Sequence, residues 1–205
     1  MKLALSEDRV EPGVPLAVDA ADRVLYVASG YVEVQNQRGA TALGTNEAWY
    51  GAGAAMVHAR GAATLWRWEL REEASREARG VKLIREVEVD RAGSLMRCDR
   101  VDFPAGGVAY THTHQGPGIR VLLEGRFTVR VNGHASAIAP GEAWFESGPD
   151  PVYAEAGTEA PAAFVRVMVL PVALLGKTSI RYVNAEDQAR PKSQRYTVFL
   201  DTPLG

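Results

Sequence analysis

The sequence has only one cysteine, Cys98, and its formal net charge is only -2 over 205 residues. A single cysteine excludes an intramolecular disulfide. The near balance of 23 basic and 25 acidic side chains creates no strong field to attract a phosphate backbone or an anionic membrane, so we expect no nucleic-acid partner. The chain also lacks the ~18 consecutive apolar residues of a membrane span and any signal-peptide pattern at its start. These absences predict a cytoplasmic protein that does not insert into a membrane.

What the chain does contain is a series of short apolar runs, such as VLYVASGYVEV, IRVLLEGRFTVRV and AAFVRVMVL, broken by Gly, Pro, Asn and Asp. Runs of this length, rich in Val, Leu and aromatic residues, predict β-strands, and many short strands indicate a barrel or a sandwich. Residues 68–80 differ because their charges give no apolar stripe. We expect this segment to be a solvated linker or a short exposed helix.

The chain also contains an internal repeat. NEAWYGAG begins at Asn46 and GEAWFESG begins at Gly141, and the same shift of 95 residues places Gly30 on Gly125. Further on, ATLWRWEL matches AAFVRVMV, with a slightly longer shift. A repeat of this size is typical of two copies of one small β-domain.

The repeat predicts three segments. Residues 1–75 form a first β-domain, residues 76–172 form a second, and residues 173–205 form a C-terminal extension. Because the first copy has few leading strands, we expect the extension to pack against it. Trp49 and Trp144 occupy equivalent places in the two copies, which favours a role in core packing.

The second copy resembles a cupin. The first motif of that family has a Gly, five residues, His-x-His and a closing Gly, and Gly106, His112, His114 and Gly125 match it. The whole chain resembles a bicupin whose first copy is degenerate. This resemblance implies an all-β protein made of two tandem jelly-roll barrels.

Two positions depart from the family pattern. Gly118 stands where the resemblance implies a metal-ligand Glu, and Val152 stands where it implies a metal-ligand His. The resemblance therefore supplies two ligands in place of four.

Alternation along a strand predicts that Tyr110, His112 and His114 share one face, which the resemblance turns towards the barrel interior. Two neutral imidazoles can bind one divalent ion such as Zn, Fe, Ni or Mn, although a tight site takes three or four protein ligands. The alternative is a histidine pair that hydrogen-bonds an organic ligand or water. Side chains on nearby segments that could complete a metal site are Glu146, Tyr153, His134 and Cys98.

Arg120 is predicted to point inward as well, because it alternates with Gly118. A buried guanidinium needs an anion, and its planar fork suits a carboxylate. One possibility is that Arg120 lies near the mouth and pairs with Asp102 or Glu142. The other is that Arg120 binds a small carboxylate ligand, with Tyr110 as a second substrate-binding residue.

Two functions remain open at this stage. The protein is either a binding cupin that holds a small anionic molecule in its second barrel, or a metal-dependent cupin enzyme of the dioxygenase, isomerase or hydrolase type acting on a small oxygenated acid. The residues leave catalysis undecided. A small molecule is the expected partner, and a homodimer is consistent with the resemblance.

Overall fold

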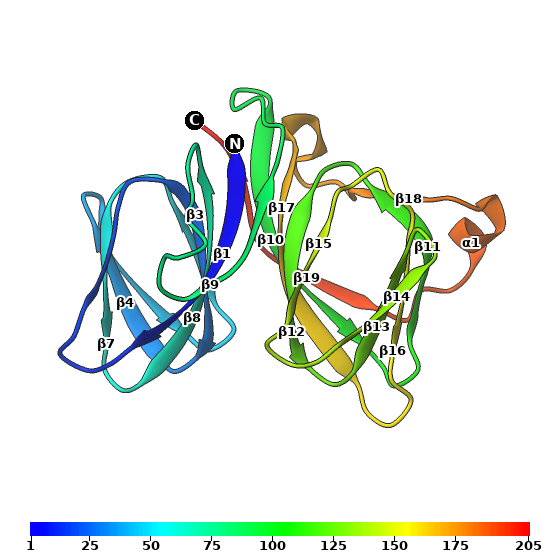
Figure 1. Ribbon diagram of the computed structural model, residues 1–205, viewed down its shortest axis with the longest axis horizontal. Coiled ribbons are helices and arrows are strands. Elements are labelled where there is room, and N and C mark those ends of the chain that lie inside the picture. The colour runs from blue at the N-terminus through cyan, green and yellow to red at the C-terminus, as the bar shows by residue number, and fades with distance from the viewer. The chain divides into compact units, whose positions relative to one another are not determined.

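The computed structural model describes residues 1–205 as two compact units, Met1–Val89 and Asp90–Gly205. Apart from one short 3-10 helix and one short α-helix, all of its regular elements are strands (Figure 1). The predicted all-β class is therefore confirmed. Neither helix has the length and apolar character needed to cross a membrane.

Strands β1 to β9 belong to the first unit: β1 (Lys2–Val10), β2 (Leu16–Val18), β3 (Asp22–Ser29), β4 (Tyr31–Asn36), β5 (Gly39–Gly44), β6 (Ala48–Gly51), β7 (Ala55–Ala59), β8 (Ala63–Arg71) and β9 (Val81–Glu86). The remaining elements belong to the second unit: β10 (Ser94–Phe103), β11 (Val108–His114), β12 (Gly118–Glu124), β13 (Phe127–Val131), β14 (His134–Ile138), β15 (Ala143–Glu146), β16 (Val152–Ala156), β17 (Ala162–Pro171), η1 (Val172–Leu174), β18 (Ile180–Tyr182), α1 (Ala185–Ala189) and β19 (Arg195–Pro203).

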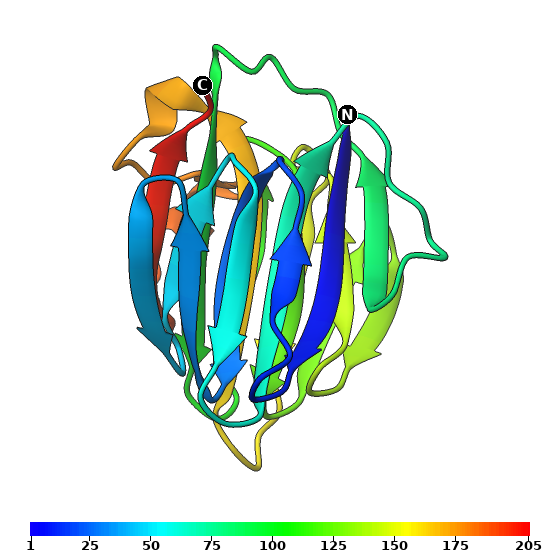
Figure 2. The same ribbon diagram turned by 90° about the vertical axis from the view of Figure 1, so that its left-hand side faces the viewer.

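The two units repeat the same strand order. In the first unit one sheet has the order β6-β3-β8-β1-β9 and the other has the order β2-β7-β4-β5. In the second unit the sheets are ordered β15-β12-β17-β10-β19 and β14-β13-β16-β11-β18. Strands β1 to β8 thus correspond to β10 to β17, and Figure 2 shows the blue and cyan strands of the first unit running side by side. The repeat read from the sequence is a repeat of structure.

The glycines shared by the two copies have a backbone reason. Gly30 and Gly125 have φ angles of 93° and 82°, which disfavour a residue with a side chain. A Cβ at Gly30 would lie 2.8 Å from the carbonyl oxygen of Ala62, and one at Gly125 would lie 2.4 Å from that of Pro161. Each turn therefore needs glycine for its conformation and for the close approach of the start of β8 or β17.

The structure corrects two predicted boundaries. Strand β9 pairs with β1 and extends the first sheet, so the first unit continues to Val89 and does not end at residue 75. The charged segment, residues 68–80, contains no helix, because β8 extends to Arg71 and only turns, bends and irregular backbone lie between it and β9. The C-terminal extension was expected to pack against the first copy. Its strands instead pair within the second unit, β18 with β11 and β19 with β10. In the first unit, β9 already occupies the corresponding edge of β1.

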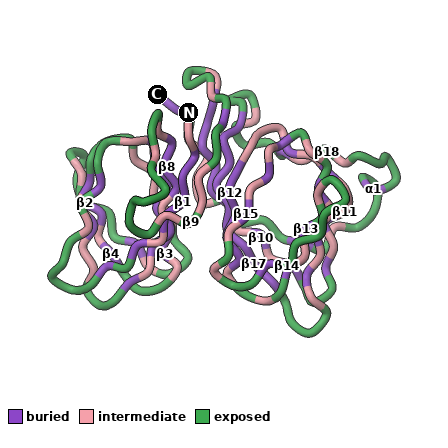
Figure 3. Tube along the Cα trace, in the orientation of Figure 1, coloured by how far each residue is buried: buried purple, intermediate pink, exposed green.

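The core of the second unit is aromatic and lies between its two sheets. Phe127 packs edge-on against Phe103 and Phe164, with ring centroids 5.0 and 5.4 Å apart, and Trp144 lies 5.2 Å from Phe164. Figure 3 shows buried positions concentrated on the strands and exposed positions in the connecting loops. Trp49 packs against the core of the first unit, so both repeated tryptophans serve the core as predicted.

Candidate functional site

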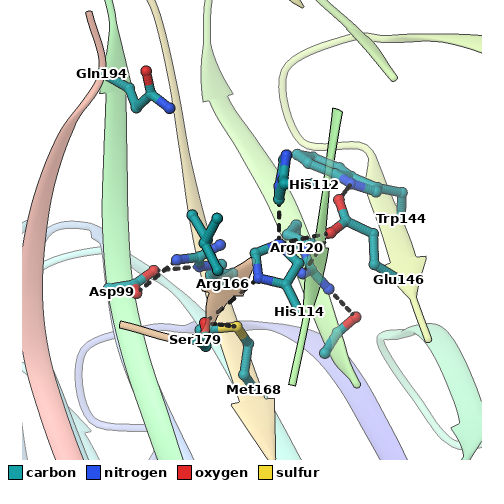
Figure 4. A network of polar contacts seen from close by, with 12 residues as sticks. Asp99, His112, His114, Arg120, Trp144, Glu146, Arg166, Met168, Ser179 and Gln194 are labelled. Carbon is teal, nitrogen blue, oxygen red and sulfur yellow. Dashed lines mark hydrogen bonds and ion pairs between the residues drawn. The ribbon is translucent and has the colours of Figure 1, made fainter. Parts of the chain in front are cut away.

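Four polar side chains meet inside the second unit and form what we call the interior cluster: His112, His114, Arg120 and Glu146 (Figure 4). The histidines come from β11, the arginine from β12 and the glutamate from β15. All four are at most 7% exposed. The pairing of β12 with β15 sets Gly118 opposite Glu146, which brings the carboxylate next to the arginine on the same face of the sheet.

Arg120 is fully buried and already has a carboxylate of the protein beside it. Its Nη2 lies 2.6 Å from Oε2 of Glu146, and its Nη1 donates a hydrogen bond of 2.6 Å to the carbonyl oxygen of Gly118. The inward direction predicted for Arg120 is therefore right, but its carboxylate partner is Glu146, which the sequence analysis had not considered for this role. The two acids considered as partners lie elsewhere, because Asp102 pairs with Arg100 and Glu142 accepts from the backbone N–H of Ala139.

The Arg120–Glu146 pair is close in distance but incompletely hydrogen-bonded. Nε and Nη2 of Arg120 and Oε2 of Glu146 have no partner in hydrogen-bond geometry. Burial lowers the pKa of Arg120 to about 10, which still leaves it charged at neutral pH. Burial alone would raise the pKa of Glu146, but Arg120 and His114 hold that pKa well below its ordinary value. The interior thus holds one fixed positive and one fixed negative charge.

The hydrogen bonds of the histidines define their tautomers. His112 Nδ1 lies 2.7 Å from the carbonyl oxygen of Tyr110, which can only accept, so Nδ1 donates and Nε2 is the acceptor. His114 Nε2 lies 3.2 Å from both that nitrogen and Oε2 of Glu146. Facing two acceptors, His114 Nε2 carries the proton. Its Nδ1 is then free to accept from the hydroxyl of Ser179, 3.4 Å away.

The interior cluster does not fit a divalent metal ion. No group of three or more His, Cys, Asp or Glu side chains is arranged to hold one. Arg120 supplies the positive charge at Glu146, and the other oxygen of that carboxylate accepts 2.9 Å from Nε1 of Trp144. His112 and His114 lie together as predicted, but the third ligand that a metal would need is engaged by an arginine and a tryptophan.

The other proposed ligands do not reach the histidines. Tyr153, His134 and Cys98 are absent from the lining of the cavity beside them. Tyr153 donates to Glu155 on its own strand, and burial raises the pKa of the Cys98 thiol well above its ordinary value. None of the three completes a metal site.

Tyr110 does not face the interior with the histidines. The pairing of β11 with β16 shifts register between Ala109 and His112, so strict alternation breaks at this bulge. Ala109 and His112 line the interior cavity and Tyr110 does not. Its ring instead lies beneath the guanidinium of Arg190, 5.0 Å from the ring centre. The prediction that Tyr110 binds substrate beside Arg120 is therefore not supported.

The cavity inside the second unit has a volume of only about 20 Å³. A volume of this size holds about one water molecule. Phe103, Phe127 and Phe164 fill much of the space between the sheets. A carboxylic acid of several carbon atoms therefore does not fit beside Arg120.

A much larger hollow opens next to this cavity, and we call it the cleft. It has a volume of about 780 Å³, and it shares Arg166, Ile180 and Tyr196 with the lining of the interior cavity. The residues that line it are Arg97, Asp99, Arg166, Gly176, Lys177, Thr178, Ser179, Ile180, Arg181, Tyr182, Gln188, Tyr196, Val198 and Asp201. The extension that follows β17 thus provides most of one wall.

One buried and one partly buried ion pair form the floor of the cleft. Arg166 donates to both oxygens of Asp99, at 2.6 and 3.0 Å, and Arg97 pairs with Asp201 at 2.7 Å. The sequence comparison matched Arg166 with Arg67 of the first copy but assigned no role to either. In the structure Arg67 also pairs with an aspartate of the first strand, Asp8. Both copies therefore have an Arg–Asp pair between their first and last strands. The recurrence of an Asp and an Arg on these strands of the repeat is the sequence signal that could have predicted the floor of the cleft.

Lowering the pH should destabilise the protein through His114, because burial lowers the pKa of this side chain from 6.5 to about 3. Below pH 6.5 the His114 imidazole is protonated in the unfolded chain but stays neutral in the folded chain. The free energy of unfolding therefore falls as the pH falls. Through His114, the free energy of unfolding should fall by about 2 kcal/mol between about pH 7 and about pH 5. His112 should add a further loss, because burial also lowers its pKa. The low pKa of Glu146 acts in the same direction only below about pH 4.5.

Urea denaturation at several pH values measures this effect. His114→Gln removes the titrating group while keeping a polar side chain, so its unfolding free energy should change less between pH 7 and pH 5. An equal fall in the variant would show that other groups take up the protons.

No protein-family model matches the sequence, and no curated protein matches it. Solved structures do resemble the fold. A structure of the oxalate decarboxylase of Bacillus subtilis, a protein with Mn(II) centers, has a TM-score of 0.68 at 11% identity and covers 93% of this chain and 73% of that chain. The salicylate 1,2-dioxygenase of Pseudaminobacter salicylatoxidans has a TM-score of 0.60 at 11% identity, with coverage of 96% and 75%.

A cupin 2 conserved barrel domain protein from Leptotrichia buccalis is also similar, with a TM-score of 0.53 and 16% identity. The match covers 82% of this chain and 84% of that chain. At these identities the similarity shows a shared backbone fold, and it does not indicate that this chain has the activities of those proteins. The structural neighbours confirm the expectation drawn from the His-x-His motif, and the chain has the cupin fold.

Proposed function

We propose that this protein binds a small anionic molecule in the cleft of its second unit. The observation that carries the proposal is a cleft of about 780 Å³ whose lining includes four cationic side chains and two acidic ones. Small-molecule sites commonly enclose about 300–1,000 Å³. The cleft is therefore large enough for an organic acid, whereas the interior cavity is not.

The surplus positive charge lies where a ligand would enter. Of the four cationic side chains, Arg97 and Arg166 are neutralised by their aspartates. Lys177 and Arg181 are exposed, and they donate hydrogen bonds to neutral acceptors, the carbonyl oxygen of Ala173 and the side-chain oxygen of Gln115 respectively. These two charges favour an anion over a neutral molecule.

The cleft also offers flat apolar surface. Tyr182 and Tyr196 both line it, and burial raises the pKa of Tyr182 to about 12, so its hydroxyl stays neutral and can donate a hydrogen bond. The guanidinium of Arg166 lies 5.7 Å from the ring centre of Tyr196, which orients that ring. The tyrosine rings can pack against an apolar or aromatic group of a ligand, while the nearby cationic side chains bind its carboxylate.

A thermal-shift panel tests the proposal. Benzoate, phenylacetate, succinate and citrate are added separately to the wild-type protein, and at least one should raise the melting temperature. At a concentration ~100 times its dissociation constant, a ligand stabilises by about 2.7 kcal/mol, which corresponds to several degrees.

Charge reversal of the cleft supplies the matched comparison. Lys177→Glu/Arg181→Glu should keep the fold, because both residues are exposed, and should lose the thermal response. Arg38→Glu/Arg126→Glu changes the net charge equally at exposed positions that do not line the cleft, and it should respond like the wild type. The proposal fails if no acid shifts the wild type, or if both double variants respond alike.

A further inference from the structure

The guanidinium of Arg120 lies at the centre of the interior cluster. It approaches Glu146 within 2.6 Å, and Glu146 in turn lies 3.2 Å from Nε2 of His114, which is 3.2 Å from Nε2 of His112. Figure 4 shows the two histidines, the arginine and the glutamate converging from different strands. Two imidazole nitrogens and a carboxylate are donors that a divalent ion would accept. Here they surround a side-chain cation.

The charge of the cluster requires such a cation. Glu146 is ionised, because Arg120 and His114 lower its pKa, and both histidines are neutral because burial lowers theirs. A buried carboxylate without a positive partner is costly. Arg120 meets this requirement without any ion from solution.

The glycine at position 118 lies between Arg120 and the backbone of β17. A Cβ added at Gly118 would lie 3.1 Å from Nη1 of Arg120 and 2.6 Å from the carbonyl oxygen of Val167. Nη1 also donates to the carbonyl oxygen of Gly118 itself. A side chain at position 118 would meet the backbone of β17 as well as Arg120, so glycine suits this enclosed position.

The first unit also contains a buried Arg–Glu contact, although its glutamate, Glu69, lies on β8 and additionally pairs with Arg67 and Arg71. Arg23 is fully buried, pairs with Glu69 at 3.0 Å, and donates to the carbonyl oxygens of Gly53 and Asp19. It lies on β3, the strand that corresponds to β12. Each unit therefore balances a buried glutamate with an arginine from the same strand of the repeat.

We propose that Arg120 takes the place of a divalent metal ion in the second unit and prevents the protein from binding one there. The guanidinium neutralises Glu146 and occupies the space in front of it. This inference does not depend on a ligand in the cleft.

The wild-type protein provides the first test. After expression in medium supplemented with Mn, Fe, Co and Zn, elemental analysis should find far less than one metal ion per chain. Titration with Co²⁺ should give none of the visible absorption of a cobalt–histidine site. One equivalent of metal in the wild type, lost in His112→Ala/His114→Ala, would overturn the proposal.

Removing the guanidinium provides the second test. Arg120→Leu leaves Glu146, His112 and His114 without an internal cation, so this variant should bind Co²⁺ at least tenfold more tightly than the wild type, with cobalt–histidine absorption. Added Co²⁺ should raise its melting temperature. The additional change His112→Ala should abolish this gain, which would place the ion in the interior cluster.

A folded Arg120→Leu protein that binds Co²⁺ no better than the wild type would contradict the inference. If this variant cannot be isolated folded, Arg120→Gln keeps a hydrogen-bond donor for Glu146 while removing the charge, and the same titration applies. The proposal is also contradicted if both variants are refolded in the presence of Co²⁺ and neither binds the ion more tightly than the wild type.

Discussion

Glu146→Leu should destabilise the second unit by about 3–5 kcal/mol, because it leaves the fully buried guanidinium of Arg120 without its carboxylate. The same change removes the acceptor of the Trp144 indole N–H, which then has no partner in the core. Urea denaturation followed by backbone hydrogen exchange measures the loss and assigns it to a unit. The protection of backbone amides against hydrogen exchange should fall mainly in residues 90–205, compared with the wild type.

Two further variants separate charge from packing. Glu146→Gln keeps an acceptor for Trp144 but removes the negative charge, so it should lose a smaller part of the stability. Arg120→Leu/Glu146→Leu removes both charges and should recover much of what the single change loses, as replacement of a whole buried pair often does. A single Glu146→Leu variant as stable as the wild type would show that Arg120 gains no stability from this carboxylate.

Phe127→Ala should lower the free energy of unfolding by about 3–5 kcal/mol. Phe127 is only 2% exposed, and its ring contacts Phe103, Phe164 and Trp144 at centroid distances of 5.0, 5.4 and 5.9 Å. Truncation opens a hole between the two sheets and removes the edge-to-face contacts as well as the buried area. Denaturant unfolding with the same exchange measurement checks the size and the location of the loss.

Phe127→Leu is the matched control, because it keeps most of the apolar volume and removes only the ring contacts. It should cost less than half as much as the alanine change. Equal losses for the two variants would mean that aromatic geometry, and not filled volume, dominates this core.

The fold could be predicted from the sequence because its signals are local or repeated. Short Val-rich and Leu-rich runs broken by turn residues predicted strands, and the shift of 95 residues that matched Gly30 with Gly125 predicted two copies. Both glycines have positive φ angles and lie against the starts of β8 and β17 in the structure. Such backbone requirements are met by one residue type, so they can be recognised in the sequence.

The partners of the extension could not be predicted in this way. A strand-like sequence shows that a segment will pair, but several open edges can accept it. Strands β18 and β19 pair with β11 and β10 of the second unit, where their register places Ser179 and Tyr196 at the cleft. The cleft therefore exists only through contacts between segments far apart in the chain.

The sequence by itself determined that the chain is all-β and repeated, that His112 and His114 lie together, and that Arg120 points inward, since these follow from strand periodicity and a spaced motif. Only the tertiary structure decided that Glu146 faces Arg120, because the register of β12 against β15 sets this contact. It also decided that a bulge turns Tyr110 away from the interior. Register and bulges arise from hydrogen bonding between strands, and composition along one strand does not encode them.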